Sequence, residues 1–412
     1  MADLKFQDLV KISDTRIDNL SSELHQLSLK IWENPELKYE EFFAHNLLTE
    51  TLKDYNFDVN PQFTLPTAFR AAYSPKINKE DDGDTLTAGI ICEYDALPNI
   101  GHACGHNLIA EAGIAAALGV QAALKSSSSL GRVVVYGTPA EEGGGGKIKM
   151  IKNKCFEEVD FIMMVHPHSY NAAFPTYIAC IGVKVTYKGH QAHASGGPWE
   201  GVNALDAAVM AYNGISMMRQ QMKPTWRIHA IITEGGTAFN VIPARASLHC
   251  GVRAPTIPEL KILKKKVHSI FEAAARSTGC KVEINWDGEP YKNLVTNSIL
   301  ATTFQENAQE LGAPYMPWYE QITKPGGSTD MGNVSQYKPA IHPRYFVSNS
   351  VTHTPEFQAE AGTKEAHQYT MIAAKSMART CLHIMSQPDL MKEINMEFSE
   401  SVKVQGGELD DE

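Results

Sequence analysis

Apolar residues recur at helical spacing through most of the first fifty residues of the chain. Leu20, Leu24, Leu27 and Ile31 fall on one face of a helix. Residues 40–52 repeat the same amphipathic pattern. The chain therefore begins with two predicted helices, each with one face turned toward a core.

Continuous apolar runs then alternate with helical segments. The runs 87–92, 132–136 and 161–165 are typical of buried strands, and the alanine-rich segment 108–124 is typical of a buried helix. This alternation predicts an α/β fold, a mostly parallel sheet with helices on both faces. In such sheets the loops after the carboxyl ends of the strands build the site.

The pattern changes between residues 179 and 295. The order there is strand, helix, strand, strand, helix, strand, over 181–188, 201–220, 225–233, 246–254, 257–278 and 281–286. This order predicts a ferredoxin-like βαββαβ domain with a four-stranded antiparallel sheet. We expect it to be inserted into a discontinuous first domain, 1–178 and 296–412. Its expected roles are to cover the site and to form a homodimer through an edge strand or a helix.

Length and composition favour a soluble two-domain protein in a reducing compartment. The 412 residues, 43% of them hydrophobic, are enough for two domains with their own cores. No stretch approaches the roughly 18 uncharged apolar residues of a membrane span, and the first residues lack the apolar core of a secretory signal. Seven cysteines without framework spacing suit free thiols, so we expect a cytoplasmic protein.

The charge balance argues against a nucleic-acid partner. The chain has 47 acidic and 37 basic residues, a net charge of −10. Nucleic acid binding rewards clustered Lys and Arg instead. An acidic protein can attract a cationic small molecule, although acidity more often serves solubility. No membrane partner is expected either.

Cys104 and His106 are the first candidate ligands. They stand two residues apart in the run Gly-His-Ala-Cys-Gly-His-Asn, a glycine-flanked turn. A thiolate and an imidazole at this spacing suit a transition metal. Most cysteines are simply small buried hydrophobes. Other metal-capable residues that follow strand-like runs favour the ligand interpretation here.

Glu141 and Glu142 follow the strand-like run 132–136. Adjacent residues in an extended segment point in opposite directions, so one carboxylate can hold a metal while the other faces the cleft and transfers a proton. Surface glutamate pairs are common, but these two end an apolar strand. The glycines that follow do not form a phosphate loop, because Lys147 precedes Ile148 rather than Ser or Thr.

Further candidates lie near other strand ends. His166 leaves the strand-like run 161–165 directly and is the expected ligand, whereas His168 is expected behind it or at the surface. His353 can complete the site from the end of the first domain. Asp95 can orient a ligand imidazole through its second N–H, or it can be an ordinary turn aspartate before Pro98.

Together these segments resemble the aminoacylase and carboxypeptidase-G family of two-metal peptidases. The resemblance rests on Glu93-Tyr-Asp-Ala-Leu-Pro98, Gly101-His-Ala-Cys-Gly-His-Asn107, Pro139-Ala-Glu-Glu142, His166-Pro167, Gly189-His-Gln-Ala-His-Ala-Ser195, Asn240-Val-Ile-Pro243 and His353-Thr-Pro355. Gly-His-Asn and the segment 327–335 resemble one branch most, the β-alanyl-lysine (Xaa-Arg) dipeptidases and their relatives that cleave aminobenzoyl-glutamate.

The resemblance implies roles for individual residues. The implied metal ligands are Cys104, His106, Glu142, His166 and His353. Glu141 is implied as the general base, Asp95 as a catalytic-site carboxylate, and His193 as a group that reaches from the partner subunit to polarise the scissile carbonyl. Asn240, Gly327 and Ser328 are implied to contact substrate with His193. The family's usual His-x-Asp reads Glu93-Tyr-Asp95 here and the usual bridging aspartate is missing, which leaves the bridging ligand open.

The implied cofactors are two divalent metal ions. Thiolate, imidazole and carboxylate ligands favour Zn²⁺, with Mn²⁺ or Co²⁺ as alternatives. The implied activity is cleavage of dipeptides such as β-alanyl-lysine, or others with a basic C-terminal residue, by metal-activated water. The alternatives are an N-acyl-amino-acid or aminobenzoyl-glutamate amidohydrolase and a catalytically silent metal-binding scaffold.

Overall fold

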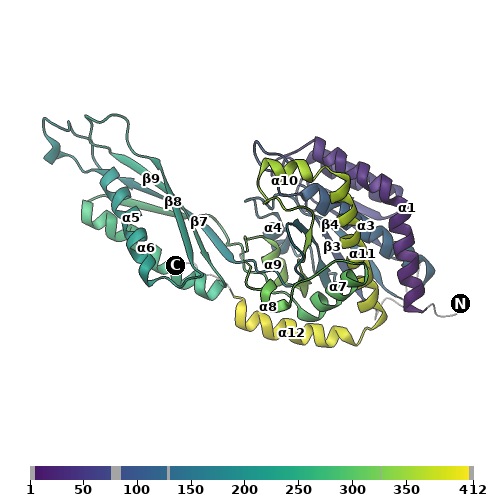
Figure 1. Ribbon diagram of the computed structural model, residues 1–412. Helices are drawn as coiled ribbons and strands as arrows, with labels where there is room; N and C mark the ends of the chain where they lie inside the picture. The colour runs from purple at the N-terminus through teal and green to yellow at the C-terminus, as the bar shows by residue number, and fades with distance from the viewer. Residues whose placement is uncertain (1–4, 76–84, 128–129, 325, 408–412) are drawn as a thin grey trace. The chain divides into compact units, whose positions relative to one another are not determined.

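The computed structural model describes residues 5–75, 85–127, 130–324 and 326–407 (Figure 1). The chain divides into two compact units. The first comprises Met1–Thr176 and Leu294–Val402, and the second comprises Tyr177–Asn293 together with the end of the chain from Lys403. The junctions predicted from the sequence lie close by, near residues 178 and 296, but the prediction placed the C-terminal end in the first domain.

A mixed six-stranded sheet forms the centre of the first unit, with strand order β1-β2-β4-β3-β5-β11. Its strands are β1 (Asp58–Pro61), β2 (Phe69–Tyr73), β3 (Thr87–Cys92), β4 (Arg132–Gly137), β5 (Phe161–Met163) and β11 (Ala340–Ile341). β3, β4, β5 and β11 are parallel, whereas β2 is antiparallel to both of its neighbours. β6 (His166–His168) pairs in parallel with β12 (Arg344–Phe346). The loops after β3 and β4 therefore leave the sheet at the same edge.

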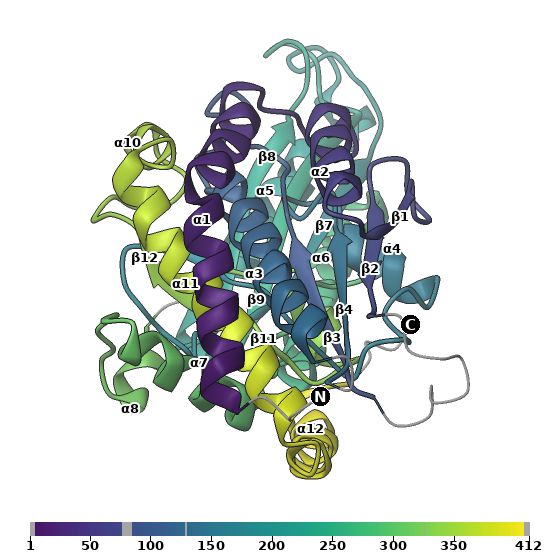
Figure 2. The same ribbon diagram turned by 90° about the vertical axis from the view of Figure 1, so that its right-hand side faces the viewer.

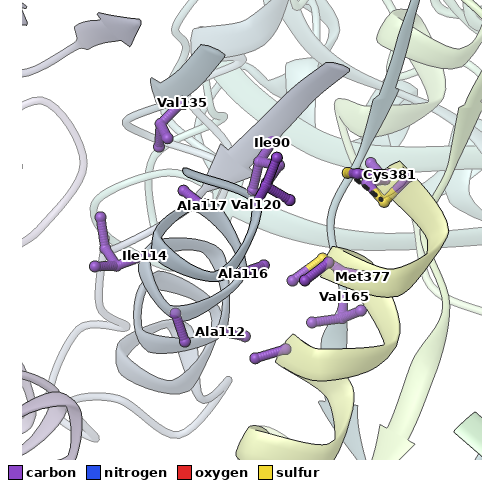
Figure 3. Packing of buried hydrophobic residues seen from close by; sticks show 14 of the residues in the cluster. Ile90, Ala112, Ile114, Ala116, Ala117, Val120, Val135, Val165, Met377 and Cys381 are labelled. Atoms are coloured by element: carbon purple, nitrogen blue, oxygen red, sulfur yellow. Dashed lines mark hydrogen bonds between the residues drawn. The ribbon is translucent and has the colours of Figure 1, made fainter. Parts of the chain in front are cut away.

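Three long helices pack against one another beside this sheet: α1 (Phe6–Glu33), α3 (His106–Ser126) and α11 (Lys364–Ser386) (Figure 2). α3 is almost entirely buried, and its alanines allow close approach. In Figure 3, Ala116 and Val120 of α3 face the region of Ile90 from β3 and Met377 from α11. This apolar layer holds the N-terminus of α3 at a fixed place beside the sheet.

α3 is also long and apolar enough to cross a membrane by composition, contrary to the expectation that no stretch would be. Once the chain is folded, 94% of its most apolar window is buried, which is typical of the core helix of a soluble protein. Among the described residues it is the only helix that meets this criterion.

The remaining helices of the first unit are shorter. They are α2 (Phe42–Asp54), α4 (Gly146–Lys152), α7 (Ser298–Glu310), α8 (Trp318–Gln321), α9 (Met331–Ser335), α10 (Pro355–Glu360) and α12 (Leu390–Gln405), whose last residues from Lys403 belong to the second unit. α4 and α9 pack against each other. His353 precedes the short helix α10.

The second unit has the expected order β7 (Ala179–Lys188), α5 (Ala204–Met218), β8 (Arg227–Glu234), β9 (Arg245–Ala254), α6 (Ile257–Thr278) and β10 (Lys281–Trp286). Its sheet order β10-β7-β9-β8 is antiparallel throughout, which confirms the predicted βαββαβ fold. Local sequence signals bound α6. The Thr256 side chain accepts the N–H of Glu259 at its start, and Gly279 at φ 73° ends it.

Candidate metal centre

Gly105 brings the start of α3 against β6, the strand that carries His166. It adopts a left-handed conformation with φ 77° at the N-cap of α3, between Cys104 and His106. A Cβ atom at this position would come within 2.5 Å of Pro167 Cγ. Only glycine combines this backbone conformation with this close approach. The glycine in Cys-Gly-His is therefore what allows the turn to approach His166.

The first group of potential ligands is Cys104, His106 and His166, whose donor atoms lie within 4.8 Å of one another. Cys104 Sγ is 3.4 Å from His166 Nε2. His166 Nδ1 lies 2.8 Å from the carbonyl oxygen of Pro167, which can only accept a hydrogen bond, so Nδ1 carries the proton and the lone pair of Nε2 faces the thiol. Burial lowers the pKa of His166 and raises that of Cys104.

The second group is Cys104, Glu142 and His353. His353 Nε2 lies 3.3 Å from Glu142 Oε1, and its side chain is 51% exposed. His353 has φ 68°, a conformation rare for a residue with a side chain. Cys104 belongs to both groups. A third group joins His106 to Glu141 and Glu142.

The donor set fits divalent cations. Asp95 Oδ1 accepts from His106 Nδ1 at 3.1 Å, so His106 Nε2 is left as the potential ligand atom. His106 Nε2 and Glu142 Oε1 are buried and make no well-aligned hydrogen bond within the described part of the chain, although His353 Nε2 lies 3.3 Å from this glutamate oxygen. Buried polar atoms are rarely left without a partner. A cation between these donors would satisfy both atoms, and thiolate, imidazole and carboxylate are ligands that Zn²⁺ accepts.

Glu141 and Glu142 do not diverge as expected from the sequence. Residues 141–144 form a turn rather than an extended segment, and Ala140 before them has φ 61°. Both glutamates therefore offer an oxygen within 4.8 Å of the His106 donor atom. Burial raises the pKa of Glu141 well above its usual value, and the nearby carboxylates of Glu93 and Glu142 add to the shift.

Lys147, Glu93 and Asp330 form a buried ionic cluster beside Glu141. Lys147 Nζ donates to Glu93 Oε1 at 2.5 Å and to Asp330 Oδ1 at 2.7 Å, and all three side chains are fully buried. Glu93 and Asp330 also lie within 4.8 Å of the Glu141 carboxylate. No role was predicted for these three residues from the sequence. The signal available was the position of Glu93 and Asp330 inside the recognised motifs.

Two buried histidines near the site were also missed. His102 is 1% exposed, and burial lowers its pKa to about 3. The His342 ring centroid is 5.6 Å from that of His166, and burial lowers its pKa as well. His102 belongs to the Gly-His-Ala-Cys-Gly-His motif, so its position was visible in the sequence. His342 follows β11 directly, which is the same strand-end signal that His166 gives.

The other expected site residues lie elsewhere. His193 and Asn240 are exposed and belong to the second unit, where the Ala194 N–H donates to the Asn240 carbonyl oxygen at 3.0 Å. Gly327 is exposed and Ser328 is half-buried, in the segment of the first unit that leads to Asp330. His168 is partly buried in β6 and makes no part of the ligand groups found among the described residues.

A separate polar cluster lies among α1, α3 and α11. His25, Glu111 and His367 are close enough to hold a metal. However, the Glu111 carboxylate contacts His367 Nδ1, and the Ser21 hydroxyl lies 2.8 Å from His367 Nε2. Both ring nitrogens of His367 are thus engaged. We interpret this cluster as a hydrogen-bonded network that ties three helices together.

Comparison with known proteins identifies related peptidases. The family described as a peptidase dimerisation domain matches residues 180–279. An Xaa-Arg dipeptidase of Mus musculus is 45% identical over 390 residues, which cover 93% of this chain and 90% of the relative. The Xaa-Arg dipeptidase of Homo sapiens is 44% identical over 402 residues, 95% of this chain and 92% of the relative. A p-aminobenzoyl-glutamate hydrolase chain of Escherichia coli is 26% identical over 97% of this chain and 96% of its own length.

Solved structures share the fold. A putative aminohydrolase of methicillin-resistant Staphylococcus aureus superposes with a TM-score of 0.74 at 19% identity, covering 92% of this chain and all of the other. The Bacillus subtilis YXEP protein, described as a dinuclear metal binding peptidase, has a TM-score of 0.66 at 18% identity, with 90% and 99% covered.

The fold, the ligand groups and these relatives define a metal-dependent hydrolase built from an α/β unit and an inserted dimerisation domain. The chain belongs to the M20 family of metallopeptidases, and it is a peptidase. This assignment favours an enzyme over the catalytically silent scaffold considered from the sequence.

Proposed function

We propose that this peptidase cleaves dipeptides with a basic C-terminal residue, such as β-alanyl-lysine or Xaa-Arg dipeptides. The observation that carries this proposal is the 45% and 44% identity to two Xaa-Arg dipeptidases over more than nine tenths of the chain. The 26% identity to an aminobenzoyl-glutamate hydrolase supports an N-acyl or aminobenzoyl amino acid as the second candidate substrate.

Two divalent cations, Zn²⁺ before Mn²⁺ or Co²⁺, are the proposed cofactors. The residues that would hold them are Cys104, His106 and His166 in one group and Cys104, Glu142 and His353 in the other. When bound, such ions polarise the scissile carbonyl and make water a stronger nucleophile near neutral pH. Asp95 keeps the His106 ring in the orientation that this arrangement needs.

Glu141 is the proposed general base. Its carboxylate would take a proton from the attacking water and pass it to the leaving amine. A raised pKa brings a carboxyl group closer to the working pH, where proton transfer in both directions is most effective. Without a bound cation, burial together with the carboxylates of Glu93 and Glu142 raises the pKa of Glu141.

His193 is the proposed donor to the scissile carbonyl oxygen. Its Nδ1 accepts the backbone N–H of Gly196 at 3.1 Å and that of Ser195 at 3.3 Å. An Nδ1 that accepts two hydrogen bonds leaves the proton of a neutral imidazole on Nε2. Nε2–H is then free to donate to a carbonyl oxygen. The Asn240 carbonyl oxygen accepts the N–H of Ala194, the residue after His193, so Asn240 would contact the substrate near His193. Gly327 and Ser328 would contact the substrate from the first unit.

We further propose a homodimer through the second unit, in which His193 serves the partner's site. β8 is an edge strand of its sheet and exposes Ile231 and Ile232. The neighbouring helix α5 exposes further apolar side chains, namely Val209, Met210, Tyr212 and Met217. Exposed apolar patches that adjoin an open sheet edge are typical of interfaces. Cytoplasmic location is proposed on the free state of all seven cysteines.

A substrate panel tests the proposed activity. The metal-replete protein is assayed with β-alanyl-lysine, hippurate and aminobenzoyl-glutamate, and kcat/KM is compared. β-Alanyl-lysine is expected to be the best of the three. The proposal is wrong if it is the poorest, and a preference for aminobenzoyl-glutamate selects the second candidate.

A further inference from the structure

The turn that carries Glu141 and Glu142 is held from one side by the short segment Lys38–Glu41, which precedes α2. The Glu41 side chain is fully buried, although a glutamate in water is ionised at neutral pH. Its carboxylate accepts three hydrogen bonds within the first unit. Oε1 accepts from the N–H groups of Tyr39 and Ala140, both at 2.9 Å, and Oε2 accepts from the Thr67 hydroxyl at 2.7 Å.

Ala140 is the residue that needs this support. It precedes Glu141 directly and has φ 61°, a left-handed conformation that alanine rarely adopts. Strained residues of this kind persist only where their surroundings hold them. The Glu41 carboxylate fixes the Ala140 N–H, and the turn is closed by the Gly144 N–H, which donates to the Ala140 carbonyl oxygen at 3.1 Å. The backbone orientation of Glu141 thus depends on a peptide that Glu41 holds.

Two further contacts from the same segment reach the other end of the turn. The Tyr39 hydroxyl donates to the Gly144 carbonyl oxygen at 2.5 Å, and Lys38 Nζ donates to the Gly143 carbonyl oxygen at 3.4 Å. A Cβ atom on Gly144 would come within 2.9 Å of the Tyr39 ring, so the ring packs directly on the backbone of the turn. The segment therefore contacts the turn at three points, of which only the one from Glu41 is fully buried.

We propose that Glu41 is a positioning residue that sets the orientation of Glu141 through the Ala140 peptide. This inference rests on the proposed role of Glu141 as the general base. The contribution of Glu41 is geometric, because its contact with the turn is a hydrogen bond to a backbone N–H. A displacement of about 1 Å in a catalytic group can lower a rate by about 10²-fold. Burial raises the pKa of Glu41 to about 7, while its hydrogen bonds oppose that shift.

Glu41→Ala and Glu41→Gln separate position from charge. Glutamine can present its carbonyl oxygen to both backbone N–H groups and donate its amide to the Thr67 oxygen, so it keeps the geometry without the charge. We expect Glu41→Ala to lower kcat at least about tenfold with KM changed less than about threefold, and Glu41→Gln to stay within about threefold of the parent. The matched control is Glu40→Ala, because Glu40 is the exposed neighbour, and it should leave kcat unchanged. Bound metal per chain is measured for each variant.

A double-mutant cycle with Glu141→Gln distinguishes positioning from general damage. If Glu41 acts through Glu141, adding Glu41→Ala to Glu141→Gln causes no further loss of kcat. Three results would each overturn the inference. The first is a double variant whose loss of kcat is the product of the two single losses. The others are a Glu41→Gln variant as impaired as Glu41→Ala and an unchanged kcat in Glu41→Ala. Full activity of Glu141→Gln would instead reject the proposed function of Glu141.

The inference can still be tested if the substrate assignment is wrong or if Glu41→Ala does not fold. The assay uses whichever dipeptide or N-acyl amino acid the parent protein cleaves best, so an incorrect substrate assignment does not affect it. If Glu41→Ala does not fold, Tyr39→Phe removes the hydroxyl bond to Gly144 and keeps Glu41. In that variant we expect amide hydrogen exchange at Gly144 to be faster than in the parent, with exchange at Val135 in β4 unchanged, and a lower kcat. Unchanged exchange and unchanged kcat would overturn the inference.

Discussion

Asp95 Oδ2 accepts the backbone N–H of Glu142 at 2.9 Å, while Oδ1 of the same carboxylate lies 3.1 Å from His106 Nδ1. Asp95, in the loop after β3, thereby connects the loop after β4 to the start of α3. One carboxylate fixes two candidate ligands, one through its ring and the other through its backbone. Burial would raise the pKa of this carboxyl group, but its contacts with His106 and the Glu142 N–H lower it below the usual value.

Asp95→Asn should therefore weaken metal binding. The asparagine amide has one oxygen that accepts hydrogen bonds and one nitrogen that can only donate them. Either the His106 ring or the Glu142 N–H therefore loses its acceptor. Loss of such an outer contact lowers metal affinity by about 10- to 100-fold. Competition with a chelator measures the affinity. The control is Asp54→Asn at the exposed end of α2, and equal affinities in the two variants would contradict the role of Asp95.

Glu141→Gln should abolish most activity and leave metal binding intact. An amide cannot accept the proton of the attacking water, and general-base catalysis contributes at least about 10²-fold. The expected result is a fall in kcat of that size with an unchanged number of metal ions per chain. Metal analysis and steady-state kinetics on the same preparation measure both. An unaffected rate removes Glu141 from the mechanism.

Lys147→Met should destabilise the first unit strongly. Removing the cation leaves the carboxylates of Glu93 and Asp330 buried beside each other without compensation, which typically lowers the free energy of unfolding by about 3–5 kcal/mol. Lys154→Met is the comparison, because the ion pair of Lys154 with Glu157 is exposed and such pairs contribute at most about 1 kcal/mol. Denaturant unfolding measures both. Similar losses in the two variants would show that the buried cluster is not required for stability.

Acid should destabilise the protein partly through His168. Burial lowers the pKa of His168 in the folded chain to about 3, from 6.5 in the unfolded chain. The folded state thus favours the neutral ring, so this contribution to stability is complete above about pH 6.5 and is lost as the pH falls toward 3. His168→Gln should flatten the dependence of unfolding free energy on pH over this range, measured without metal. The exposed His249 provides the control, His249→Gln. Identical slopes for parent and His168→Gln would contradict the prediction.

Mixed dimers test whether His193 acts on the partner's site. His193→Ala and Glu141→Gln subunits are each expected to be nearly inactive as homodimers. A mixed dimer contains one site with an intact Glu141 that meets an intact His193 from the other subunit, so activity should partly return on mixing. If none returns although the mixed dimer forms, His193 does not act in trans.

Much of the architecture followed from local pattern. The bounds of β3, α6 and β10 agree with the sequence expectation, because each is a strong periodic run bounded by turn residues. The strand-end rule also selected Cys104, Glu142 and His166, which the structure brings together. His353 has no local signal, because it approaches them only through the tertiary fold.

The remaining errors concern burial and backbone conformation. Lys147 looked like the end of a failed phosphate motif, yet it is fully buried because Glu93 and Asp330 from distant segments surround it. The assumption of an extended Glu141-Glu142 segment was wrong, because residues 141–144 form a turn and Ala140, whose N–H donates to the distant Glu41, adopts a left-handed conformation. Neither fact can be obtained from periodicity or composition.

The junction of the second unit has a consequence for how such chains can change. Cys180 and Tyr291 exchange a pair of backbone hydrogen bonds, at 2.9 and 3.0 Å, so the inserted segment leaves almost where it enters. Once the more than one hundred intervening residues are folded, they connect two neighbouring points of the first unit, as a short surface turn does. The entropic cost of closing this connection during folding is therefore small. We therefore expect that a change in the length of the insertion has a small effect on the folding of the first unit.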